Sequence, residues 1–304
     1  MVRRAGCLVL VQVTENRDNK ELLVKVIRHL AGENPGGAMT IKGFYGLKLT
    51  SASVGHEAPL RFPKGYTGYF LLKKAPDAKS WQLATPTAGW ATLGEKKVVT
   101  ATFRHSYHKA LVDADTYEKA MTAIFNHLHG KKHDAKFIRG LFDDVLKQKP
   151  AALDPRNYTG ETSALFFKQH VAMECFYYFG TEADLPLLEP FVNSEDFHCQ
   201  VSAARALSGV DCERSRKRLV EFVEAADRAP FAKVMAVWGL KRLGARGSAA
   251  RLRKYAATAK AAGEKCGFGG NIMDPRVGTA FPDTVKGAID ALLAEWDKAE
   301  DSKR

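Results

Sequence analysis

The pattern of hydrophobic and polar residues changes character along the chain. Up to about residue 104, apolar residues form short runs or alternate with polar ones. This spacing is typical of β-strands, because successive side chains of a strand point to opposite faces. From about residue 112, apolar residues recur every three or four positions, which predicts amphipathic helices. The sequence therefore predicts an α+β protein in two parts.

Six strands are predicted in the first part. They cover residues 8–13, 22–28, 39–41, 69–72, 81–84 and 98–103. Turn-forming residues separate them, as in Asn34-Pro35-Gly36-Gly37 and Phe62-Pro63-Lys64-Gly65. Short strands divided by Gly and Pro clusters indicate a small β-barrel or sandwich. We expect this N-terminal domain to cover residues 1–108.

The first helices of the second part are predicted at 115–129, 133–148 and 161–179. Asp115 can cap the first helix, since aspartate accepts hydrogen bonds from the free N–H groups of a first turn. Pro150 ends the second helix, because proline cannot continue the hydrogen-bond ladder. Gly180 follows the third helix as a candidate C-cap.

A motif repeats in the last third of the chain. The pattern Val-x-Ala-x-x-x-Leu occurs at 201–207 and again at 234–240, an offset of 33 residues, and each copy is followed by a glycine, Gly209 or Gly244. Helix pairs are predicted at 184–208, 213–243 and 247–298. A period of this length, built of helix pairs, is typical of an α-solenoid.

This repeat resembles HEAT repeats, over roughly residues 160–299. The resemblance implies an all-α HEAT-like domain, which we place at 112–299, with residues 300–304 as a disordered tail. Solenoids offer extended surfaces to other proteins. The resemblance therefore implies a protein partner.

The first part resembles the netrin/TIMP-like OB barrels. The resemblance rests on the strand that ends at 28–32 and on the later segment Gly-Tyr-Thr-Gly-Tyr-Phe-Leu-Leu at 65–72. It implies a barrel. The disulfides of the animal TIMP proteins are absent, because Cys7 is the only cysteine among the first 104 residues, and no inhibitory site is carried over.

The cysteines and the N-terminus bear on the compartment. Five cysteines without close spacing argue against a disulfide framework or a Cys-x-x-Cys zinc site. No segment has the roughly 18 apolar residues that span a bilayer, and the apolar run at 7–13 is better interpreted as a strand than as a signal peptide. We expect a cytoplasmic protein, or one of the cell envelope or periplasm if an export signal is missing from this sequence.

Composition places the chain among globular proteins, with 45% hydrophobic and 26% charged residues. This excludes a collagen-like or wholly disordered chain. The chain has 46 Lys and Arg against 34 Asp and Glu, a net charge of +12. The charge is uneven, because residues 151–200 carry 2 basic and 8 acidic residues whereas 210–265 carry 14 and 6.

Ten basic residues recur at similar places in consecutive repeats of the basic block. They are Arg214, Arg216, Lys217, Arg218, Lys241, Arg242, Arg246, Arg251, Arg253 and Lys254. Stacked repeats would align them into a stripe, which predicts a surface for a protein partner or for phosphate groups. A solvated basic face is the simpler interpretation.

Five of the nine histidines gather between residues 105 and 133. They are His105, His108, His127, His129 and His133. Imidazoles are good ligands for zinc, copper and nickel, which makes these residues metal candidates. The alternative is polar residues at a loop and a helix end, and no His-Glu-x-x-His motif is present.

The function hypotheses follow from these patterns. No Gly-x-Ser-x-Gly motif or recognised cysteine nucleophile occurs, so we predict no catalytic residues and no cofactor. The first hypothesis is a non-enzymatic scaffold whose solenoid holds a protein partner. The second is nucleic-acid binding through the stripe at 210–265, and the third is a metal-dependent enzyme at the histidine-rich junction.

Overall fold

The computed structural model describes residues 2–18, 20–42, 48–50, 57–59, 62–84, 89–102, 109–154, 156–157, 161–266 and 282–301. It forms two compact units, which we treat separately. One covers Met1–Ile138, and the other covers Arg139–Gly270 together with Ala280–Arg304.

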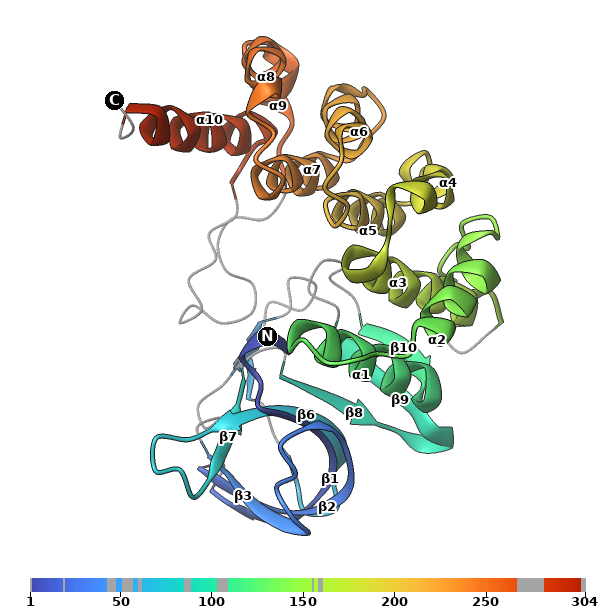
Figure 1. Ribbon diagram of the computed structural model, residues 1–304, viewed down its shortest axis with the longest axis vertical. Helices are drawn as coiled ribbons and strands as arrows, with labels where there is room; N and C mark the ends of the chain where they lie inside the picture. Colours follow the sequence, from blue (N-terminus) through green and yellow to red (C-terminus); the bar gives the residue numbers. More distant parts are fainter. Residues whose placement is uncertain are drawn as a thin grey trace. The chain divides into compact units, whose positions relative to one another are not determined.

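The first unit contains a closed barrel of five strands (Figure 1). They are β1 (Cys7–Arg17), β2 (Glu21–Gly32), β3 (Ala38–Lys42), β6 (Thr67–Lys74) and β7 (Trp81–Leu83). The order is β1-β2-β3-β7-β6, and β6 also pairs with β1, which closes the barrel. Strands β3 and β7 run parallel, whereas the other neighbours are antiparallel.

The barrel interior is filled by alternate side chains of its strands. Strand β1 contributes Cys7, Val9, Val11 and Val13, which are buried together with aromatic residues of the neighbouring strands and loops. This alternation is the pattern that the sequence showed. The barrel form is therefore confirmed.

Further strands extend the sheet beyond the barrel. Strands β8 (Trp90–Leu93), β9 (Val98–Thr102) and β10 (Lys109–Asp113) continue in order from β6, and β4 (Lys48–Thr50) pairs with β5 (Glu57–Pro59) in a separate ladder. The sequence did not predict β4, β5, β8 or β10, which have only three to five residues. Two 3-10 turns complete the unit, η1 (Val2–Arg4) and η2 (Glu95–Lys97).

Helix α1 (Ala114–Leu128) packs against β2 and the β9–β10 strands of the same unit. The Tyr117 ring lies 4.8 Å from the Tyr69 ring of β6. Glu118 accepts a hydrogen bond from the Tyr69 hydroxyl at 2.7 Å and pairs with Arg28 of β2. The cap is Asp113, whose side chain accepts from Thr116 N at 2.8 Å, so the predicted cap, Asp115, which lies two residues later, was wrong.

The second unit is helical. Its helices are α3 (Glu161–Phe179), α4 (Glu189–Val192), α5 (Phe197–Leu207), α6 (Glu213–Glu224), α7 (Pro230–Arg242), α8 (Ala249–Ala256), α9 (Ala259–Gly263) and α10 (Val285–Asp301), with 3-10 turns η4 (Glu182–Leu188) and η5 (Arg246–Ser248). The bounds of α3 match the prediction. Helix α2 (Ala135–Leu141) crosses the division between the units and continues as a π turn, η3 (Phe142–Leu146).

These helices form two rows (Figure 1). In the first row, α3, α5, α7 and α10 contact one another in succession, and in the second row α6 contacts both η4 and α8. The repeated Val, Ala and Leu positions of α5 and α7 are all buried. The predicted fold class, a β-barrel part followed by a helical part, is confirmed.

Two glycines after the helices serve close packing rather than left-handed caps. Of Gly180, Gly209 and Gly244, only Gly244 has a positive φ, at 57°. A Cβ on Gly209 would lie 2.2 Å from the carbonyl oxygen of Tyr177, and one on Gly180 would lie 2.4 Å from the Phe176 ring. Gly180 directly follows α3, as predicted, and its N donates to Phe176 O at 2.8 Å, but its φ is not positive.

No helix among the described residues is both long and apolar enough to cross a membrane.

Candidate functional site

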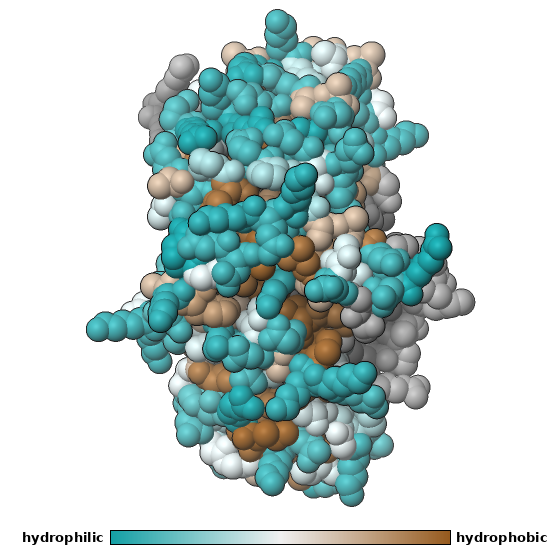
Figure 2. Space-filling model, turned by 90° about the vertical axis from the view of Figure 1, so that its right-hand side faces the viewer, coloured by the Kyte–Doolittle hydropathy of each residue, from teal (hydrophilic) through white to brown (hydrophobic). Residues whose placement is uncertain are grey.

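The ten basic residues of the predicted stripe are divided between the two rows. Lys241 and Arg242 end α7 in the first row, whereas the other eight lie on α6, η5 and α8. Figure 2 shows one face of the molecule, on which hydrophilic side chains dominate and hydrophobic ones form small patches.

Half of these ten cations pair with carboxylates of the same unit. The pairs are Arg216–Asp211, Arg218–Glu189, Lys241–Glu295, Arg251–Glu224 and Arg253–Asp297. Most of them join different helices, so they connect neighbouring elements of the array. Among the described residues, Arg214, Lys217 and Lys254 have no such partner, so half of the charge of the stripe is balanced by carboxylates of the same unit.

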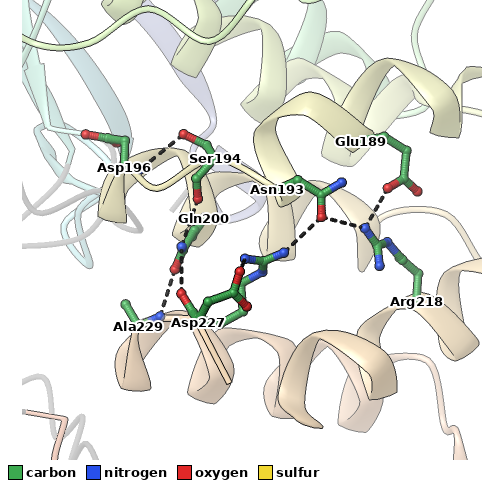
Figure 3. A network of polar contacts seen from close by, with 9 residues as sticks. Glu189, Asn193, Ser194, Asp196, Gln200, Arg218, Asp227 and Ala229 are labelled. Carbon is green, nitrogen blue, oxygen red and sulfur yellow. Dashed lines mark hydrogen bonds and ion pairs between the residues drawn. The ribbon is translucent and has the colours of Figure 1, made fainter. Parts of the chain in front are cut away.

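The Arg218 pair belongs to a larger polar network (Figure 3). The Arg218 guanidinium donates to Glu189 at 2.6 Å and to the Asn193 side-chain oxygen at 3.0 Å. Arg228 donates to the same Asn193 oxygen at 2.8 Å and also pairs with Asp227. One amide at the end of α4 thus binds two arginines of the next helix pair, one on α6 and one in the α6–α7 loop.

Gln200 forms the second half of the network and binds both the α4–α5 loop and the α6–α7 loop. Its amide nitrogen donates to Ser194 O at 2.9 Å, and its oxygen accepts from Ala229 N at 2.8 Å. Gln200 is only 2% exposed. Buried amides of this kind satisfy loop backbone groups that would otherwise lack partners.

Polar residues occupy corresponding places in the neighbouring helices. Gln169 of α3 accepts from Ala151 N at 2.9 Å and donates to Lys149 O at 2.9 Å. Lys233 of α7 lies 33 positions after Gln200 and is fully buried. A weak sequence signal existed, namely a polar residue just before the repeated valine of α5 and α7.

Lys233 forms a compact ionic cluster with residues of α8 and the end of α9. Its ammonium donates to Tyr255 at 2.7 Å and pairs with Glu264 at 2.5 Å. The Tyr255 hydroxyl donates to the other Glu264 oxygen at 2.8 Å. Burial lowers the pKa of Lys233, although Glu264 opposes this effect.

Tyr177 of α3 lies between two arginines of the first row. The guanidinium of Arg205 lies 3.9 Å from the ring centroid and that of Arg242 lies 4.4 Å away. Arg205 forms a bidentate ion pair with Glu174, with N···O distances of 2.8 and 2.9 Å. Arg242 instead donates to the Tyr177 hydroxyl and to Ser208 O, so it has no carboxylate partner within the described residues.

Partly exposed large side chains also lie on the helices of the first row. They are Tyr177, Tyr178, Phe197, Met235 and Trp238. Each lies on α3, α5 or α7, the helices that carry the two arginines. We call these five residues with Arg205 and Arg242 the first-row face.

The described histidines lie around the end of α1. The His127 and His133 rings meet edge to face, with their centroids 5.9 Å apart. His129 Nδ1 donates a hydrogen bond to Phe125 O at 2.8 Å. His105 and His108 lie outside the described residues. No three metal-ligating side chains cluster among the described residues. The metal-dependent enzyme stays a prediction, which elemental analysis of the purified protein would test.

Burial makes most of the cysteine thiols unreactive. All five are free, and four of them are buried. Burial raises the pKa of Cys7 to about 12 and that of Cys266 to about 11. These thiols stay protonated at neutral pH and are poor nucleophiles.

Comparison with known protein families, with curated proteins and with solved structures finds no match for this chain. The function must therefore be argued from the surfaces described above.

Proposed function

We propose that this protein is a non-enzymatic scaffold that holds a protein partner on the first-row face of a HEAT-like solenoid. The two rows of helices and the 33-residue motif support the HEAT-like assignment. The closed barrel of five strands supports an OB-like assignment for the first unit.

The observation that carries the proposal is the composition of the first-row face. Tyrosine, tryptophan, phenylalanine, methionine and arginine are the residue types enriched in protein interfaces. Binding hot spots likewise favour Trp, Tyr and Arg in packed surroundings. The stacked Arg205 and Arg242 are already held in place, which reduces the entropy lost on binding.

Arg242 indicates the chemistry of the partner. Its guanidinium is exposed and contacts only neutral groups, the Tyr177 hydroxyl and the Ser208 carbonyl. A carboxylate of the partner would supply the missing opposite charge. We infer that the partner presents an acidic residue beside apolar side chains.

The test compares charge reversals on the two rows. Partners captured by the wild-type protein from its own cell extract would be purified, and their dissociation constants measured with R242E and W238A. We expect each substitution to weaken binding at least tenfold, because it removes a central contact. The control is K254E on α8, which we expect to bind like the wild type. A partner that binds all variants equally would refute the first-row face.

Nucleic-acid binding through residues 210–265 stays a second hypothesis. It gains little support from a block in which half of the ten cations are ion-paired. Retention on DNA or RNA at several salt concentrations, with Arg214, Arg218, Arg251 and Arg253 each changed to Glu, would test it.

A further inference from the structure

The scaffold proposal does not use a group of exposed cations on turn η1, in the chain after helix α1 and in the first turn of α2. Helix α1 ends at Leu128, and Gly130 with a φ of 66° turns the chain away. Lys131 N then donates to Asn126 O at 2.8 Å, which closes the turn. The chain that follows carries its charged side chains on the surface.

We define the α1-end patch as Arg3, Arg4, Lys131, Lys132 and Lys136. All five side chains are exposed, and none makes an ion pair within the described residues. Asp134 is the nearest acid in sequence. It caps α2, because its side chain accepts a hydrogen bond from Phe137 N at 2.9 Å. This absence of partners contrasts with the paired arginines of α6 and α8.

The fold brings the two segments of the patch together within one unit. Turn η1 contacts α1. The pKa of His127 is lowered by partial burial, by His133 and by the charge of Arg3, which places Arg3 near the end of α1.

Compensation of the helix dipole explains only part of this charge. A helix C-terminus carries the equivalent of about half a negative charge, whereas the patch has five cations. Retaining unpaired cations side by side costs repulsion that an external anion would relieve. The patch therefore fits a strongly anionic ligand surface.

We propose that the α1-end patch binds the headgroups of anionic phospholipids at a membrane surface. Clusters of four to eight Lys and Arg bind such surfaces through the negative surface potential. Lysine, which makes up three of the five cations, acts as a compact point charge without a fixed hydrogen-bonding geometry. A nucleic acid is less well matched, because the patch has no aromatic or amide side chain to stack on or read bases.

The experiment measures co-sedimentation of the full chain with vesicles. One set contains 30% phosphatidylserine in phosphatidylcholine and the other contains phosphatidylcholine alone. We expect binding to the first set only, with loss at high salt. The triple variant K131Q/K132Q/K136Q should bind about a hundredfold more weakly, since each cation near the surface contributes about a fivefold factor.

The matched control is R214Q/K217Q/K254Q. It removes the same number of unpaired cations from α6 and α8, so net charge alone would predict an equal loss. We expect wild-type binding from this control. Equal binding to both vesicle sets, or equal loss in both triple variants, would overturn the proposal. A parallel titration with a single-stranded and a duplex oligonucleotide adds a third arm. Binding there that depends on the patch, without vesicle binding, would assign the patch to nucleic acid instead.

Discussion

At some positions of the barrel, the close approach of two backbone segments limits which residue type fits. Gly32 ends β2 with a φ of 85°, and a Cβ there would lie 2.1 Å from the Gly6 carbonyl oxygen. Gly36 has the same φ, but a Cβ there would meet nothing within 4 Å. Substitutions at these two positions therefore distinguish the free-energy cost of a left-handed backbone from that of a steric clash.

We expect Gly32→Ala to lower the free energy of unfolding by about 3 kcal/mol, since it adds a clash to the left-handed strain. Gly36→Ala should lower it by only about 1 kcal/mol, from the strain alone. Urea denaturation of both variants would measure the difference. Equal losses would show that the approach of Gly32 to Gly6 does not limit the fold.

Asp77, in the turn between β6 and β7, makes stability depend on pH. Hydrogen bonds from Ser80 and Lys79, with Lys42 nearby, lower the pKa of this carboxyl below its ordinary value of 3.8. A carboxyl whose pKa is lowered by folding stabilises the fold above its unfolded pKa, and this contribution is lost as the pH falls below it.

We expect wild-type stability to fall between pH 5 and pH 2, and Asp77→Asn to show a smaller decrease over the same range. At pH 7 the variant should be less stable, because the charge-assisted bond to Lys42 is gone. Denaturation curves at several pH values would measure both effects. An unchanged pH dependence in the variant would contradict this role.

At the scale of elements, buried polar side chains hold successive helix pairs in register. Gln169, Gln200 and Lys233 occupy the first-row helices and bind loops or the next pair. Lys233 is the most demanding, because a buried cation is tolerated only when it is paired. Glu264, at the end of α9, supplies the negative charge that pairs with Lys233.

We expect Lys233→Ala to cost about 3–5 kcal/mol of unfolding free energy, because it leaves Glu264 without its cation. The double variant K233M/E264Q should recover most of this loss, since it removes both charges. The control is Lys260→Ala, at an exposed position of α9, which should be close to neutral. Equal losses in the single and double variants would contradict the ion-pair explanation.

Element boundaries show where periodicity misleads. The apolar spacing at 133–148 predicted one helix, but α2 gives way to the π turn η3 at residue 142. Phe142, Val145 and Leu146 are all buried, but positions i, i+3 and i+4 share one face of a regular helix as well. Their spacing therefore gives no signal of the π turn, which packs against α3.

At the scale of the whole molecule, each unit has its own core and its own tryptophans. Trp81 and Trp90 belong to the barrel unit, and Trp238 and Trp296 belong to the helical unit. A unit with its own core can unfold by itself. We expect two unfolding transitions, one shifted by Gly32→Ala and the other by Lys233→Ala. Fluorescence of variants that keep the tryptophans of one unit would measure them, and a single transition shifted by both would show one cooperative fold.

The sequence by itself determined the two-part fold class, because strand and helix periods differ and are visible in a single chain. It located six of the strands, the helix α3 and the repeated buried positions of α5 and α7. It missed β4, β5, β8 and β10, which have three to five residues, although it located the three-residue strand β7. Alternation over so few positions is a weak signal.

Only the tertiary structure decided which charges remain available. Arg218, Arg251 and Arg253 looked like one stripe with Arg214 in the sequence, yet they pair with acids 27 to 44 positions away. The sequence did not single out Lys131, Lys132 and Lys136, yet these lysines make no ion pair among the residues that the structure describes. Ion pairing depends on distances of a few ångströms between side chains, and only folding sets those distances.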